Sequence, residues 1–330
     1  MSSNCSWALR TPSAWRSTPT TWSRRHSARW APSPTTWPTA WRKSRPDSMI
    51  AQHASRATAV GDTLQAPAGI QMSGVRGKVF THRGEPLVGR THGLMELALA
   101  DHRMAVDGDL AARRGNGFVS MSEALLAEGE ATGPALDAVF LAYRSPDLIT
   151  HDVAGCYLAE RLPGTPVPLA VADQGVGAPF TALRIAASMA RSGELTQGAL
   201  FVFDQNSTGW HEPFGRDTPV DTDAAVLLTF EAGDAGVRNI TERRTEDPAN
   251  ALGELRGDHP AVPVLAGAGL RAHVPDADGP PAGAGRDCTS VWFALADRSP
   301  LRQPVLLADY DRVTGRLHSC LVAPSPGRVA

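Results

Sequence analysis

The 330-residue chain has few cysteines and no long hydrophobic run. Its four cysteines are widely separated, and none belongs to a Cys-x-x-Cys pair. This spacing argues against a disulfide framework and against a zinc site, so we expect a reduced, cytoplasmic environment and no bound metal. No stretch approaches the roughly 18 uninterrupted apolar residues that a membrane span requires. We therefore expect no membrane segment.

The sequence also lacks a dominant charge and the short motifs of common cofactor enzymes. A formal net charge of −2 gives no overall field that would attract nucleic acid. Gly-x-Ser-x-Gly, P-loop and His-Glu-x-x-His motifs are absent. Residues 279–285 (GPPAGAG) have neither the lysine nor the strand–helix context of a phosphate loop, so they indicate a linker or flexible loop. We expect no cofactor and no nucleic-acid partner.

Residues 1–48 differ in composition from the rest of the chain. They hold six of the eight tryptophans, and eight basic residues against one acidic residue. No helical or strand period arranges these tryptophans, and the many prolines would break helices. A transit peptide, a Trp/Arg segment that contacts membrane or nucleic acid, and out-of-frame translation are the competing interpretations. We favour the last, with Met49 or Met72 as the true start, and we expect a disordered segment in each case.

From about residue 75 onward, apolar strands alternate with helical segments. Ala138–Tyr143 is a continuous apolar run, which predicts a strand buried on both faces of a parallel or mixed sheet. Further strands are predicted at residues 74–80, 167–172, 198–204 and 224–230, and an alanine-rich helix at residues 180–192. Short connections and regular alternation predict an α/β layered architecture with right-handed crossovers.

Additional helices and a hairpin extend this pattern. Helices are predicted at residues 91–100, at residues 121–128 with Ser120 as the N-cap, and at residues 152–162. The last of these is expected to turn Val153, Cys156 and Leu158 toward the core, with Cys156 as a buried structural thiol. Two apolar runs, residues 305–310 and 317–322, flank Thr314-Gly315 and predict a β-hairpin.

The order of these segments resembles that of the thiolase-fold ketosynthases, the β-ketoacyl-acyl carrier protein synthases. The run PLAVADQGVGAPFTALRIAASMARSGELTQGALFVFD is similar to the family's nucleophile strand, elbow, buried helix and next strand. DTDAAVLLTF resembles the strand that ends the first half, and QPVLLADYDRVTGRLHSCLVA the closing hairpin of the second. The resemblance implies a thiolase-like layered fold with a mixed sheet between helices. It implies a first half at residues 49–230 and a shortened second half at residues 231–330.

The elbow, residues 173–177, lacks the nucleophile that the family uses. An active ketosynthase attacks the acyl thioester with a cysteine at the amino end of a buried helix. One alignment puts Gln174 in that cysteine's position and another puts Gly177 there, and neither residue can carry a thioester. In the family, glutamine at this position marks chain-length factors and decarboxylating loading domains. The alternative interpretation of Gln174-Gly175 is a plain turn between strand and helix.

Cys288 and His211 are the other candidate site residues. Cys288 precedes a helix predicted to start near Thr289, and a helix amino terminus can acidify a thiol. His211 belongs to a predicted loop, where a surface histidine is the competing interpretation. The strand end at residues 264–268, where the family would carry a catalytic histidine, has none.

The resemblance implies a ketosynthase-like protein of polyketide or fatty-acyl metabolism. Gln174 favours a non-catalytic subunit, similar to a chain-length factor, whose partners are an active ketosynthase and an acyl carrier protein. The alternatives are an acyltransferase or condensing enzyme with a non-standard nucleophile, and a decayed ketosynthase. We also expect a dimer, with itself or with an active ketosynthase, built around the strand at residues 198–204.

Overall fold

The structure is a computed structural model whose described residues all belong to the unit Leu64–Ala330. The described residues are 69–81, 84–86, 93, 96–97, 114–129, 133–149, 152–206, 220, 222–234, 236–277 and 286–324. The segment 1–48 and the predicted loop at 279–285 lie outside them. Of the helix predicted at 91–100, only Gly93, Glu96 and Leu97 are described, and they are helical.

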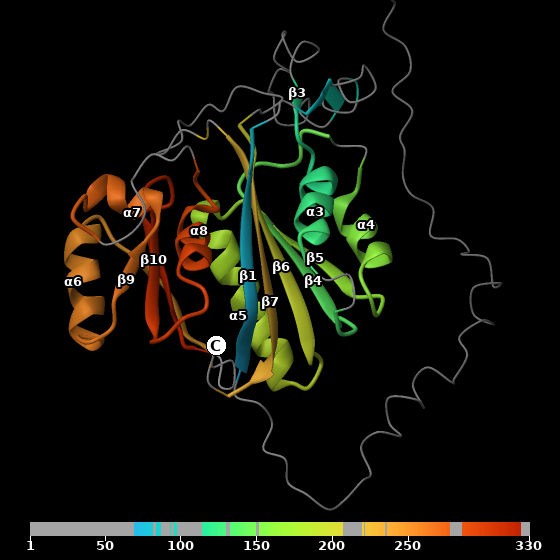
Figure 1. The fold of residues 1–330 in the computed structure, drawn as a ribbon. Helices are drawn as coiled ribbons and strands as arrows, with labels where there is room; N and C mark the ends of the chain where they lie inside the picture. The colour runs from blue at the N-terminus through green and yellow to red at the C-terminus, as the bar shows by residue number, and fades with distance from the viewer. Residues whose placement is uncertain are drawn as a thin grey trace, which may run out of the picture. The chain divides into compact units, whose positions relative to one another are not determined.

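Nine strands form one mixed sheet in the order β5-β4-β6-β7-β1-β8-β11-β10-β9 (Figure 1). The first half of the sheet consists of β1 (Gly69–Phe80), β4 (Ala138–Tyr143), β5 (Val167–Val171), β6 (Gln197–Asp204) and β7 (Asp223–Gly233). The second half consists of β8 (Val237–Arg244), β9 (Val264–Ala266), β10 (Val305–Asp311) and β11 (Arg316–Val322). A separate short pair joins β2 (Glu85–Pro86) to β3 (Arg114–Gly115).

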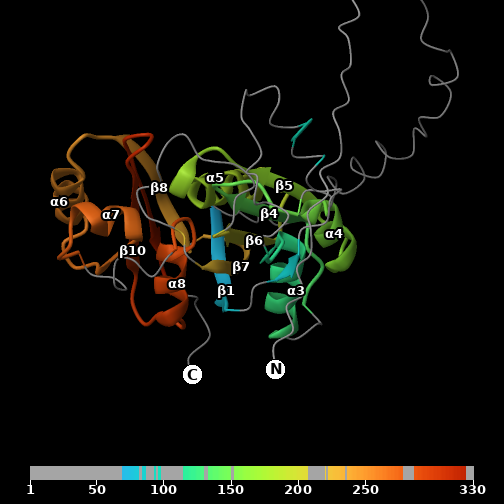
Figure 2. The ribbon, with the colours of Figure 1, turned by 90° about the horizontal axis from the view of Figure 1, so that it is seen from above.

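Helices cover both faces of the sheet, which bends so that its halves enclose a central helical layer (Figure 2). The helices are α3 (Phe118–Ala127), α4 (Ala154–Arg161), α5 (Ala178–Arg191), α6 (Pro248–Asp258), α7 (Ala268–His273) and α8 (Ser290–Asp297). Helices α3 and α4 pack on the outside of the first half, and α6 and α7 on the outside of the second. Helices α5 and α8 lie between the halves. None of the helices among the described residues is long and apolar enough to span a membrane.

The two halves of the sheet repeat one pairing pattern. In the first half β4 is parallel to β6, which is followed by antiparallel β7 and β1. In the second half β9 is parallel to β10, which is followed by antiparallel β11 and β8. Strand β5 has no counterpart among the described residues of the second half, so the second half is smaller. The predicted layered α/β fold with a mixed sheet is confirmed.

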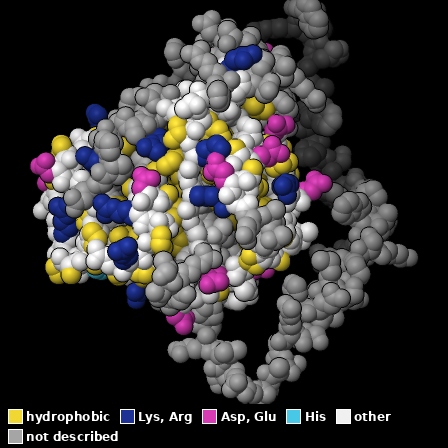
Figure 3. Space-filling view, in the orientation of Figure 1, with side chains coloured by type: hydrophobic (Ala, Val, Ile, Leu, Met, Phe, Trp, Pro, Cys, Tyr) yellow, Lys and Arg dark blue, Asp and Glu magenta, His cyan; other side chains and the backbone are white. Residues whose placement is uncertain are grey.

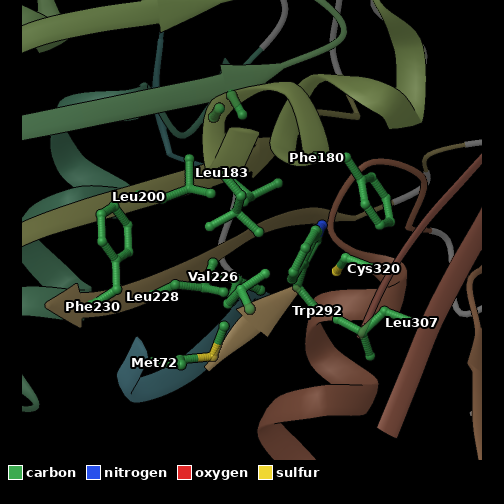
Figure 4. Packing of buried hydrophobic residues seen from close by; sticks show 14 of the residues in the cluster. Met72, Phe180, Leu183, Leu200, Val226, Leu228, Phe230, Trp292, Leu307 and Cys320 are labelled. Carbon is green, nitrogen blue, oxygen red and sulfur yellow. The ribbon is translucent and has the colours of Figure 1, made fainter. Parts of the chain in front are cut away.

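The central core joins both halves through α5 and α8 (Figure 4). Phe180 of α5 and Trp292 of α8 lie 5.1 Å apart, ring centre to ring centre. Five buried alanines of α5 (Ala178, Ala182, Ala186, Ala187 and Ala190) allow the close approach of this helix to its neighbours. Ile70 is also fully buried and precedes Met72 in β1, so a chain starting at Met72 would lose a core residue.

The predicted start of α3 and the predicted buried face of α4 are wrong. Helix α3 begins at Phe118 with Gly117 as its N-cap, and the Ser120 hydroxyl donates a hydrogen bond to the Gly117 carbonyl from inside the helix. Helix α4 begins at Ala154, which together with Leu158 faces the sheet. This phase turns Val153 and Cys156 outward, so both are exposed.

The sequence predicted a buried strand at residues 167–172 and a strand at the dimer edge at residues 198–204, and the structure shows the reverse. Strand β6 is paired on both sides, with β4 and β7, so it offers no free edge for a dimer. Strand β5 is the edge of the first half, and most of its side chains are exposed rather than buried. The apolar character of β6 therefore reflects burial inside the sheet.

On the face shown in Figure 3, basic and acidic side chains are interspersed, in keeping with the small net charge.

Candidate functional site

The elbow connects the edge strand β5 to the central helix α5. Asp173 and Gly175 have positive φ angles of 60° and 52°, so the chain reverses sharply at two left-handed residues. Gly175–Gly177 forms one 3-10 turn that continues directly into α5. A non-glycine residue in this conformation is strained, and such strain is common at ligand sites.

Gln174 lies at the start of this turn, and its side chain is held by α5. Its Oε1 accepts a hydrogen bond from the Thr181 hydroxyl at 2.5 Å. The Thr181 oxygen in turn accepts one from Arg184 Nη2 at 3.1 Å. The amide of Gln174 is thus oriented by a short relay along the first turns of the helix.

A cavity of about 670 Å³ opens in front of Gln174. It lies between the elbow, α5 and strands β8 and β11. All nine lining residues are polar or charged: Asp173, Gln174, Thr181, Arg184, Glu242, Arg244, Thr314, Arg316 and His318. Glu242 pairs with two of the arginines, with Arg184 at 3.6 Å and with Arg316. The volume suits a small-molecule ligand, but none of the described lining residues is of the apolar types that line most such cavities.

Asp311 and His318, from the closing hairpin, pack against the glycines of the elbow. A Cβ atom added at Gly175 would overlap the Asp311 carboxylate, and one added at Gly177 would overlap the His318 ring. Both positions therefore require glycine because the side chains of β10 and β11 occupy the space. The elbow is built from both halves of the fold.

His318 is 2% exposed, and its ring stacks on Phe180 at 5.8 Å. Burial lowers the pKa of its imidazole to about 4, assisted by the nearby Arg184 and Arg316 and opposed by Asp311. Neither ring nitrogen has a hydrogen-bond partner within the described part of the chain. At neutral pH His318 is an uncharged ring with one unused donor and one unused acceptor.

Cys288 lies just before the amino end of α8 and contacts the elbow. Its thiol contacts the Gly175 carbonyl oxygen at 3.4 Å. Burial raises the pKa of this thiol well above its usual value, and the nearby Asp204 and Asp287 raise it further. Arg144 opposes these effects only in part. The helix terminus does not acidify Cys288, because the surrounding carboxylates and the loss of solvent outweigh it.

Asp204 caps the amino terminus of α8. Its carboxylate accepts hydrogen bonds from the backbone N–H groups of Asp287, Cys288 and Thr289 at 2.8–3.0 Å. It also accepts one from the Thr289 hydroxyl at 2.6 Å. Asp204 ends β6 in the first half, just as Asp311 ends β10 in the second. Each half therefore places a strand-terminal aspartate at the start of the central helix of the other half.

Three ionisable residues, Arg144, Asp287 and Asp309, complete this buried region. Arg144 Nη1 pairs with Asp287 at 2.9 Å and lies 3.9 Å from Asp311. Asp309 accepts backbone hydrogen bonds from Leu270 at 3.0 Å and from Tyr310 at 2.9 Å. Burial nevertheless raises the pKa of Asp309 to about 8, so this carboxyl is largely protonated at neutral pH.

Of the residues singled out from the sequence, Gln174 and Cys288 both lie at the elbow: Gln174 lines the cavity, and the Cys288 thiol contacts the Gly175 carbonyl. His211 lies outside the described residues. The strand end of β9 leads through Gly267 into α7 and carries no histidine. Sequence reasoning missed Asp311 and His318. The only signal for Asp311 was its position after an apolar strand, where α/β sites gather. Among the described residues, no group of His, Cys, Asp and Glu side chains is arranged to hold a metal ion.

Solved structures with the same fold are thiolase-fold condensing enzymes. A 3-oxoacyl-(acyl-carrier-protein) synthase III matches 77% of this chain and 99% of its own, with a TM-score of 0.50 and 13% identity. AbyA1, a tetronic acid condensing enzyme, matches 78% of this chain and 100% of its own, with a TM-score of 0.51 and 14% identity. A variant of Xanthomonas campestris OleA, with bound lauric acid and lauroyl-CoA, matches 77% of this chain and 99% of its own. Its TM-score is 0.50 and its identity 10%.

No protein-family model matches the sequence, and no curated protein matches it. The chain therefore has the thiolase-like fold over nearly the full length of these structures, although its sequence is only 10–14% identical to theirs.

Proposed function

We propose that this protein is a non-catalytic, ketosynthase-like subunit of an acyl-assembly system, similar in role to a chain-length factor. The observation that carries the proposal is the elbow itself. It joins a strand to the amino end of a central helix, as a nucleophile elbow does, and its second residue is Gln174, whose side chain is fixed by Thr181. A hydrogen-bonded amide at this place cannot form an acyl-enzyme intermediate.

The groups around the elbow support the absence of condensation chemistry. A nucleophilic thiol needs a lowered pKa, whereas burial and two aspartates raise the pKa of Cys288. A general base must reach the proton that it removes, and His318 packs against Gly177 with a lowered pKa and no partner. The Thr181 hydroxyl is bonded to Gln174 and Arg184 rather than to a base.

The proposed partners are an active ketosynthase and an acyl carrier protein of polyketide or fatty-acyl metabolism. This part of the proposal rests on the fold and on the modified elbow. An acyltransferase that uses a different nucleophile is the alternative. The contact between Cys288 and the elbow makes this thiol the candidate nucleophile.

The proposal is tested by incubating the full-length protein with acyl and malonyl thioesters of acyl carrier protein and measuring its intact mass. We expect no covalent adduct on the wild-type chain. Gln174→Cys should react with iodoacetamide faster than Cys156, the exposed cysteine, because its thiol would sit at a helix amino terminus. It should still not condense acyl groups. A stoichiometric acyl adduct on wild-type Cys288 would instead establish the acyltransferase alternative.

The subunit role needs a second measurement, made in a reconstituted assembly. Adding the protein to an active ketosynthase and acyl carrier protein should change product yield or chain length. Gln174→Ala should alter that effect while leaving the melting temperature nearly unchanged, because Gln174 lines a cavity rather than the core. Products that are identical with and without the protein would rule the role out.

A further inference from the structure

The cavity in front of Gln174 contains more hydrogen-bond donors than acceptors. Arg184, Arg244 and Arg316 each bring five N–H donors in a planar fork. Glu242 uses its Oε2 for Arg184 and its Oε1 for Arg316, so it fixes both guanidinium groups but leaves most of their N–H groups free. Arg244 enters no ion pair that the described residues show, and Asp173 is the only other acid in the lining. A ligand that fits this cavity must supply acceptors.

His318 borders the cavity, but the ring edge that carries both nitrogens lies against Gly177. Its side chain lines the cavity although it is almost completely buried, and both ring nitrogens lack partners among the described residues. The three arginines are therefore the groups of this cavity that favour an anionic ligand.

From these observations we propose that the cavity binds a compact oxyanion, carrying carboxylate or phosphate groups, and does not accommodate an aliphatic chain. The arginine forks match the oxygens of such groups in pairs. Because every described lining residue is polar or charged, the lining fits a charged group better than a fatty-acyl tail. This site does not depend on the proposed subunit role, because every lining residue belongs to this chain.

Strand β8 offers a matched control. Arg243 and Arg244 are consecutive and both exposed, so their side chains leave opposite faces of the strand. Arg244 lines the cavity, whereas Arg243 pairs with Glu254 of α6 on the outer side. The two substitutions Arg244→Gln and Arg243→Gln remove the same charge from the same strand, and only the first removes a donor from the cavity.

The test is isothermal titration calorimetry of the full-length protein with citrate, inorganic pyrophosphate, decanoate and acetate at low ionic strength. We expect citrate or pyrophosphate to bind, and decanoate to bind no more tightly than acetate. Arg244→Gln and Arg316→Gln should each weaken binding by about tenfold, the loss expected for one charge-assisted contact. Arg243→Gln should bind like the wild type. Melting temperatures of the unliganded variants establish that all are folded.

The variants separate binding in the cavity from the general stabilisation that citrate gives to folded proteins. Preference for citrate or for pyrophosphate would identify carboxylate or phosphate as the natural group, and either supports the site. The proposal fails if none of the anions binds, if decanoate binds more tightly than citrate and pyrophosphate, or if Arg243→Gln loses as much affinity as Arg244→Gln. A failed product assay with a ketosynthase would leave this result unaffected, since the titration uses the isolated protein.

Discussion

Gly175 shows how closely single residues are fitted at the elbow. Its φ angle is positive, and a Cβ atom would overlap the Asp311 carboxylate, which is itself almost fully buried. Two costs therefore combine in Gly175→Ala: the left-handed conformation and the overlap. We expect a loss of about 3 kcal/mol in the free energy of unfolding, measured by urea denaturation.

Gly193 provides the comparison for this prediction. It also has a positive φ, 78°, but a Cβ atom there would meet nothing within 4 Å. Gly193→Ala should lose only about 1 kcal/mol, the cost of the conformation alone. Equal losses in the two variants would mean that Asp311 does not press against the elbow.

Asp309 should make stability depend on pH. Burial raises its native pKa to about 8, whereas an unfolded aspartate titrates near 4. Between these values the native state holds a proton that the unfolded state has lost, so this residue lowers stability as the pH rises from about 4 to about 8. The slope approaches about 1.4 kcal/mol per pH unit. Asp309→Asn should remove this slope. Urea denaturation at about pH 6, 7 and 8 would measure the slope in both proteins.

His318 acts in the opposite direction over a lower range that overlaps the measurement only at about pH 6, and both the wild type and Asp309→Asn contain it. Its native pKa is lowered to about 4, so the unfolded state takes up the proton first and stability falls as the pH drops from about 6.5 to about 4. Above that range His318 is neutral in both states. If the free energy of unfolding of Asp309→Asn had the same pH slope as that of the wild type over the measured range, Asp309 would be ionised in the native protein.

At the level of elements, helix α8 depends on a residue from the other half of the chain. Asp204 accepts hydrogen bonds from the backbone N–H groups of the three residues that precede α8 and from the Thr289 hydroxyl, and α8 carries Trp292 into the central core. Asp204→Asn has nearly the same shape but replaces one acceptor oxygen with a donor that faces N–H groups. We expect a loss of about 2–4 kcal/mol by thermal or urea unfolding, because buried donors remain unpaired.

Asp247 is a suitable control, since it caps α6 with one hydrogen bond, to the Asn250 backbone N–H at 3.0 Å, in an exposed position. Asp247→Asn should cost less than about 1 kcal/mol. If the two substitutions had the same effect, the connection between the halves through Asp204 would contribute no more than an ordinary surface cap.

The elements that the sequence predicted well are those whose burial is complete. Ala138–Tyr143 was predicted with its observed bounds because a central parallel strand is apolar at every position. Periodicity was less informative for α4, whose short length allows Cys156 to be assigned to either face. At α3 a capping-box spacing starting at Ser120 suggested a later start than the real one, because the backbone at Gly117 already turns into the helix.

The candidate site was only partly predictable because it is assembled across the repeat. Gln174 was found through a local strand–turn–helix pattern. Asp311 and His318 belong to a hairpin far along the chain from the elbow, and nothing local distinguishes them from other hairpin residues. Their approach to the elbow follows from the pairing of β10 and β11 with β8, which brings the second half against α5. Long-range strand pairing of this kind leaves no mark in a single sequence.

On the scale of the whole molecule, the two ends of the sheet differ. Strand β9 ends the second half, and all three of its residues are buried. Strand β5 ends the first half with Val167 at 56% exposure and with Pro168 and Ala170 also exposed. Natural proteins rarely leave an apolar edge strand uncovered, because its free N–H and C=O groups can pair with another chain. We therefore expect the dimer contact at β5, in place of the contact at β6 that the sequence suggested.

The hydrogen bonding of β5 is compatible with a two-fold contact. The Val167 N–H donates inward to the Asp137 carbonyl, so by alternation the backbone groups of Pro168 and Ala170 face outward. Proline has no N–H to leave unpaired there, as expected for an edge. An antiparallel pair centred on Leu169 would set each Ala170 N–H opposite the partner's Pro168 carbonyl, with the exposed side chains packing beside them.

We predict that the full-length protein dimerises through this edge and that Val167→Asp prevents it. A carboxylate at the contact would be desolvated and would face its own copy across the two-fold axis, which is destabilising in a paired sheet. Val313→Asp is the control, because Val313 is similarly exposed, at 51%, but lies in the turn between β10 and β11. Sedimentation velocity at micromolar concentration should show a dimer for the wild type and for Val313→Asp, and a monomer for Val167→Asp. A wild-type chain that stayed monomeric both alone and with an active ketosynthase would refute the contact, as would a Val167→Asp variant that still dimerised. If the wild type pairs only with the ketosynthase, the same Val167→Asp substitution should abolish that pairing, because a free edge serves either partner.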